Sequence, residues 1–80
     1  MNKLFLFSYV DDPDDLVTLE RAVRLRDINY IYTEDFNGTM FTVIDTDDDS
    51  FYLKESIKKV VERYNLLLGT ENEKASSEIH

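Results

Sequence analysis

Carboxylates are the side chains with which this sequence could do chemistry. Asp and Glu number 17 against 9 Lys and Arg, a formal net charge of −8, and many of the acids fall in two runs, residues 11–15 and 45–49. Carboxylate oxygens suit Ca²⁺ and Mg²⁺. The second run places acids at alternate positions, as a calcium loop does, but Ser50 and Ser56 replace the required glycine and glutamate. A calcium loop is therefore not predicted, and both runs are typical of helix caps.

Four acids, two of them from the first run, form a candidate metal site because of where the predicted strands end. Asp11 and Asp12 follow the first predicted strand, and Glu34 and Asp35 follow the second. If these strands are parallel, the four carboxylates lie at the same end of the sheet and could approach one Mg²⁺ or Ca²⁺ ion. We predict no metal or cofactor. The four acids remain the basis of one alternative function, a metal or small-ligand sensor.

Two residue types that are common in catalysis are nearly missing from the sequence, cysteine and histidine. The chain has no Cys, which excludes disulfides, thiol nucleophiles and Cys-ligated metal sites, and its one histidine is the last residue, His80. The usual general base and every Ser–His pair are therefore absent. A small sheet with two helices also offers little concavity for a substrate. We expect a protein that is not an enzyme.

The first half of the chain predicts a strand followed by a helix. Residues 3–10 are rich in aromatic and aliphatic side chains without a helical period, which favours a strand. Residues 13–26 begin with a proline that suits the first helical position, and Asp12 before it can cap the helix. The apolar side of this helix is predicted to consist of Leu16, Leu19 and Val23.

The second half predicts a hairpin and another helix. Residues 28–33 and 39–44 favour strands, and Asn37-Gly38 between them supplies the positive φ angles of a tight turn. The second helix follows residue 50 and is expected to end at Gly69. Its apolar positions recur with the helical period at Leu53, Ile57, Val60, Tyr64 and Leu67.

The element order β-α-β-β-α predicts an α+β fold. A right-handed crossover makes the first two strands parallel, and the third strand then lies between them in a three-stranded sheet of order 1-3-2. Both helices cover one face, as in a ferredoxin-like fold that lacks its last strand. We predict one domain over residues 1–68 and a disordered tail over residues 69–80. The first strand becomes an edge, and one face of the sheet stays open.

This open surface is the predicted binding site. Natural edge strands are usually blunted by charge, proline or a bulge, but the first strand is apolar on both faces, and the other two add aromatic residues. The candidate contact residues are Leu4, Phe5, Leu6, Phe7, Tyr30, Tyr32 and Phe41. The sequence does not decide which of the two alternating sets in each strand faces the helices and which stays open. We predict that the chain forms a homodimer, or binds another protein, through the open sheet face or the edge of the first strand.

Charge and hydropathy limit the other partners. A chain with eight excess negative charges repels phosphates, so we expect no nucleic acid as a partner. The apolar run in residues 3–10 is too short to span a bilayer and lacks the cleavage site of a secretory signal, so we expect no membrane partner. Without cysteine or an address signal, the predicted location is cytoplasmic.

Several segments carry a resemblance to a known family. An acidic turn leads into the first predicted helix, which ends in Arg26-Asp27-Ile28, and a later strand ends in Val43-Ile44-Asp45 before the segment ESIKKVVE at residues 55–62. With this element order, residues 3–64 resemble a small bacterial family of signal-transducing proteins of unknown specific function. The resemblance implies the β-α-β-β-α fold and a signalling role.

The leading expectation is a small, non-enzymatic protein-interaction module with a signalling or regulatory role. The first alternative is an acidic decoy or inhibitor, such as a phage-type antagonist or nucleic-acid mimic, that binds a basic protein surface. The excess negative charge would speed encounter with such a surface in a salt-dependent way. The second alternative is the metal or small-ligand sensor.

Overall fold

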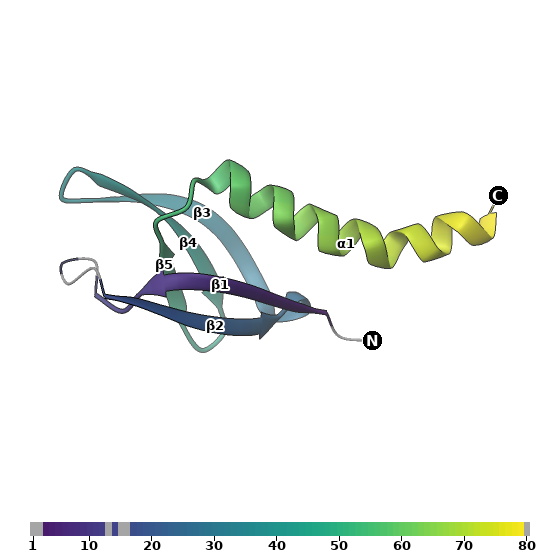
Figure 1. The fold of residues 1–80 in the computed structure, drawn as a ribbon, viewed down its shortest axis with the longest axis horizontal. Coiled ribbons are helices and arrows are strands. Elements are labelled where there is room, and N and C mark those ends of the chain that lie inside the picture. The colour runs from purple at the N-terminus through teal and green to yellow at the C-terminus, as the bar shows by residue number, and fades with distance from the viewer. Residues whose placement is uncertain (1–2, 13, 15–16, 80) are drawn as a thin grey trace.

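A computed structural model describes residues 3–12, 14 and 17–79, with side chains up to residue 69. These residues form one five-stranded antiparallel sheet of order β2-β1-β5-β4-β3 and one long helix (Figure 1). The elements in chain order are β1 Leu4–Val10, β2 Thr18–Arg24, the 3₁₀ helix η1 Leu25–Asp27, β3 Ile28–Phe36, β4 Thr39–Thr46, β5 Ser50–Leu53 and α1 Ile57–Ile79.

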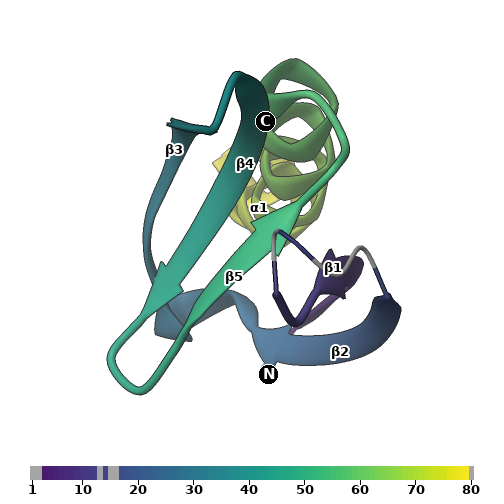
Figure 2. The ribbon, with the colours of Figure 1, turned by 90° about the vertical axis from the view of Figure 1, so that its left-hand side faces the viewer.

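The sheet consists of two parts that meet at one point. β1 and β2 pair along all seven of their residues, and β3, β4 and β5 form a meander. Among the described residues, Val10 and Tyr52 form the single ladder pair between β1 and β5. η1 joins the two edge strands, and the amide of Leu25 donates to the carbonyl of Lys3 over 2.8 Å. The sheet is therefore strongly curled, with β2 and β3 leaving η1 in different directions (Figure 2).

The main core lies between one face of the sheet and α1. Its buried members come from β1, η1, the meander and the helix: Phe5, Phe7, Leu25, Ile28, Ile44, Phe51, Leu53 and Val60. Tyr64, Leu67 and Leu68 of α1 pack against this cluster, which confirms most of the predicted apolar stripe of the second helix. β4 is buried on both faces, because Phe41 and Val43 are also buried, on the side where the Phe41 and Tyr52 rings meet.

The predicted three-stranded sheet with two covering helices is wrong. Residues 18–24, expected within the first helix, form β2. Leu19 and Val23 are four residues apart, and this spacing puts two side chains on one side of both a helix and a strand. Pairing with the whole of β1 decides for the strand. The side chain of Asp12 accepts from the amide of Asp14 over 2.9 Å in a tight turn, instead of capping a helix. The expected helix positions Pro13, Asp15 and Leu16 lie outside the described residues.

The second predicted helix also begins later than expected. Residues 50–53 form β5, in which Phe51 and Leu53 point into the core, and α1 begins only at Ile57. At its other end α1 passes Gly69 and continues to Ile79, projecting beyond the sheet in Figure 1. The division between a domain and a tail at residue 68 stays a prediction.

The predicted hairpin is confirmed. β3 and β4 pair in an antiparallel ladder around a two-residue turn, in which Asn37 and Gly38 have φ angles of 53° and 86°. Both angles are positive, as the tight turns that match strand twist require. The place of the hairpin in the sheet differs from the predicted order 1-3-2, because β5 pairs with β4 and also with β1. The edges of the sheet are therefore β2 and β3, and β1 is an interior strand.

Candidate protein-interaction site

An apolar groove lies between β1 and α1. It is lined by Phe5 and Leu6 of the strand and by Arg63, Leu66 and Leu67 of the helix, and its volume is about 240 Å³. β1 pairs with β2 on one side, whereas in the described part of the chain it pairs with β5 at Val10 alone on its other side. At Phe5 and Leu6 the neighbour is α1, so side chains from a strand and a helix form the two walls. We refer to these five residues as the β1–α1 groove.

Two leucines that line this groove are exposed to solvent. The exposed fractions are 63% for Leu6 and 70% for Leu66. Leu66 is turned outward because Leu67, the next residue on the helix, packs against the core, and successive helical residues are about 100° apart. Contiguous apolar surface of this kind is costly in water and marks interaction sites in small proteins.

Arg63 forms the polar rim of the groove. Its guanidinium carbon lies 5.1 Å from the centroid of the Phe5 ring. The same guanidinium donates from Nη1 to both carboxylate oxygens of Glu55, at 2.8 and 2.6 Å. A cation stacked on a ring and hydrogen-bonded to a carboxylate is held in one orientation. The rim is therefore held in place beside the two exposed leucine side chains at positions 6 and 66.

The predicted contact residues divide between surface and core. Leu4 and Leu6 of β1 and Tyr30 and Tyr32 of β3 are exposed. The other three, Phe5, Phe7 and Phe41, are at most 3% exposed and belong to the buried set that the sequence left undecided. Alternation along the strand explains the division in β1, because α1 covers the side that carries the two phenylalanines. The predicted edge of the first strand is also wrong, because β2 occupies it.

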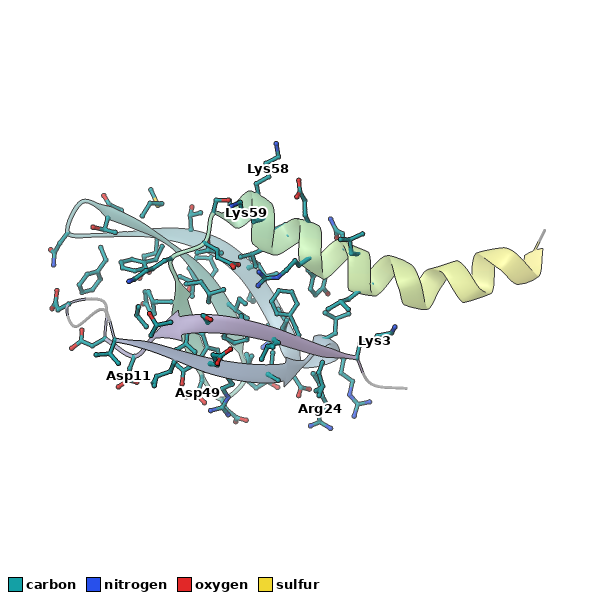
Figure 3. The ribbon with its side chains drawn as sticks, in the orientation of Figure 1. Lys3, Asp11, Arg24, Asp49, Lys58 and Lys59 are labelled. Atoms are coloured by element: carbon teal, nitrogen blue, oxygen red, sulfur yellow. The ribbon has the colours of Figure 1, made fainter. Side chains whose placement is uncertain are left out.

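Two residues of the groove were missed from the sequence, Leu66 and Arg63. Arg63 is not part of the predicted apolar stripe, and its guanidinium lies over the Phe5 ring, whereas Lys58 on the same helix points away from the sheet (Figure 3). A signal for Leu66 was present in the run Leu66-Leu67-Leu68. Three consecutive helical residues span about 200° around the axis, so one of them had to lie outside a single buried stripe.

A second, polar cleft of about 450 Å³ lies between β2 and the β4–β5 turn. Arg21 and Arg24 line it from β2, and the acids at positions 47–49 line it from the turn. Figure 3 shows Arg24 and Asp49 on the side of the molecule away from α1. Some of these charged groups already have partners within the protein. Arg24 forms an ion pair with Asp27 at 3.0 Å, and Asp47 accepts a hydrogen bond of 2.6 Å from Asn29. The cleft thus has both signs of charge, unlike the continuous negative stripe that an acidic decoy needs.

The four candidate metal-binding acids are not brought together. β5 and β4 lie between β1 and β3 in the sheet, so the ends of the two strands that carry these acids are not the neighbours that the expected site required. Glu34 instead accepts a hydrogen bond of 2.8 Å from the hydroxyl of Tyr52. This bond, together with burial, raises the pKa of Tyr52 above its usual value. Within residues 3–12, 14 and 17–79 there is no group of three or more acids or histidines that could hold a metal ion.

No protein family, curated protein or solved structure matches this chain. The β-α-β-β-α fold that the family resemblance implies is not the fold of this chain, which has five strands and one helix in the described part. In that part there is also no helix with the length and apolarity needed to cross a bilayer.

Proposed function

We propose that this chain is a small, non-enzymatic protein-interaction module that binds an apolar segment of a partner protein in the β1–α1 groove. The observation that carries the proposal is the pair Leu6 and Leu66, which are 63% and 70% exposed on the two walls of one apolar groove. Covering two leucine side chains contributes on the order of 3–5 kcal/mol before the costs of association. A regulatory role fits such a module, since it binds without changing its partner chemically.

The groove limits what the partner can present. Its volume accommodates one or two apolar side chains, not a whole folded surface, and its walls are a strand on one side and a helix on the other. A short segment with one or two large aliphatic or aromatic anchors therefore fits best. The Arg63 guanidinium at the rim favours an acceptor, such as a backbone carbonyl, next to the anchor.

The proposal is tested by selecting peptides against the purified protein from a random display library. We expect the bound peptides to share large apolar residues at one or two positions, and Leu66→Asp to weaken their binding at least tenfold in a titration. The matched control is Met40→Asp, which places the same charge at another apolar residue, 60% exposed and distant in the fold. Peptides that bind Leu66→Asp as tightly as the unaltered protein would refute the groove as the binding site.

A further inference from the structure

β3 is an edge strand whose outer side has no strand partner in the described sheet. From Tyr30 to Phe36 it pairs with β4 in a regular ladder, and the register shift lies before Tyr30, at the start of the strand. Natural edges are usually protected by charge, proline or a bulge. β2, the other edge, contains Glu20, Arg21 and Arg24, whereas β3 has no charged residue until Glu34. The part of this edge from Tyr30 to Thr33 is regular and uncharged, and an edge of this kind can accept another strand.

The side chains of β3 alternate between two rows. Ile31 packs against the main core, so Thr33 and Asp35 extend the same row toward the side of α1. Tyr30, Tyr32, Glu34 and Phe36 form the opposite row. In that row Tyr30 is 69% exposed and Tyr32 is 39% exposed. Two exposed tyrosines at an open strand edge are the kind of side chain that forms favourable cross-strand pairs.

We infer that β3 pairs with β3 of a second copy in an antiparallel ladder whose two-fold axis passes through Thr33. In this register Tyr30 lies opposite Phe36 of the second copy, an aromatic pair. Tyr32 lies opposite Glu34, where a hydroxyl meets a carboxylate. Thr33 lies opposite itself, a pairing that threonine favours. This single ladder joins the sheets of the two copies across one edge.

Other registers are less favourable on the same residues. An axis at Glu34 sets two glutamates directly opposite each other, which is destabilising. An axis at Ile31 or Tyr32 requires Asp35 and Phe36 to pair with residues in or before the irregular start of the strand. The register at Thr33 is the one that uses the whole regular stretch from Tyr30 to Phe36, which is symmetric about that residue, without opposing like charges.

This second interface is separate from the β1–α1 groove and goes beyond the proposed function. In the sheet, β5 and β4 lie between β1 and β3. A dimer through β3 therefore leaves both grooves free and presents two binding sites for the same partner, which raises the avidity for a partner with two anchors. Because an edge interface is small, the dimer is expected at high protein concentration and should dissociate on dilution.

The absence of cysteine makes the axis directly testable. Thr33→Cys should form an intermolecular disulfide rapidly under mild oxidation, because residues on the axis are opposite each other. The matched control is Asp35→Cys, whose two thiols would be about 13 Å apart along the strands, too far for a disulfide. Equal crosslinking rates for the two variants would overturn the register, and an unaltered protein that stays monomeric by sedimentation at millimolar concentration would overturn the dimer.

A charge-exchange experiment tests the same axis without oxidation. Thr33→Glu and Thr33→Lys each put like charges opposite each other, so each should weaken dimerisation roughly fivefold or more. An equimolar mixture should recover dimerisation, because the two charges then attract. Thr18→Glu on the other edge is the control and should leave the dimer unchanged. If the mixture fails to recover while both variants keep their circular dichroism spectra, the inference is wrong.

Discussion

Val60 fixes α1 to the sheet, and its truncation should have a measurable cost. Its exposed fraction is 0%, and it is the α1 member of the buried core cluster. Val60→Ala removes two buried methyl groups, and at about 0.8 kcal/mol for each the lost burial is about 1.6 kcal/mol. The cavity that remains brings the total loss to about 2 kcal/mol. Alanine is a better helix former than valine by about 0.5 kcal/mol. The free energy of unfolding should therefore fall by about 1.5 kcal/mol.

Val61→Ala is the matched control, because Val61 is the next residue and is only half-buried. The gain in helix propensity is the same in both variants, so their difference reports the burial alone. With a slope of about 1 kcal/mol per molar urea for a chain of this size, the urea midpoint of Val60→Ala should fall by about 1.5 M. Far-UV circular dichroism follows the transition. If Val60→Ala loses no more stability than Val61→Ala, the assigned contact between α1 and the sheet is wrong.

Two further predictions concern hydrogen bonds that hold β4 and β5. The pKa of Tyr52 is raised by its bond to Glu34, so this bond contributes fully below the usual tyrosine pKa of 10.0 and is lost as the pH rises through the higher folded value. Tyr52→Phe should lower the free energy of unfolding by about 1 kcal/mol at neutral pH. In urea titrations, the free energy of unfolding of this variant should fall less steeply with pH above pH 10.0 than that of the unaltered protein. The same dependence on pH in both proteins contradicts this prediction. Thr42, 2% exposed, donates over 2.7 Å to the carbonyl of Glu55, so Thr42→Val should cost about 1 kcal/mol and lower Tm by roughly 4–8 °C; an unchanged Tm contradicts it.

The hairpin was predictable because its signals are local. Asn37-Gly38 supplies both positive φ angles, and the flanking residues have the composition of strands, so no distant contact is needed to choose the turn. The first strand was predictable for a similar reason, since a run of alternating leucine and phenylalanine residues has no helical period. In both segments composition and period point to the same structure.

The segments that were predicted wrongly are those where two periods fit the same residues. Leu19 and Val23 suit a helix and a strand equally, and Leu53 fits both the start of a helical stripe and the alternation with Phe51 in β5. Residues 18–24 became a strand because they pair with β1, and residues 50–53 because they pair with β4. Without these partners, β1 and β4 would each have left backbone amides and carbonyls without hydrogen bonds. Local propensity contains no information about that pairing.

The sequence by itself determined that this protein is small, acidic, free of cysteine and supplied with more apolar strand residues than one face can hide. Only the tertiary structure decided which of them reach solvent. By covering Phe5 and Phe7, α1 left Leu4 and Leu6 outside, and by turning Leu67 inward it turned Leu66 outward. The physical reason is that alternation along a strand and rotation around a helix specify which residues share a side, whereas packing between distant segments selects the side that is buried.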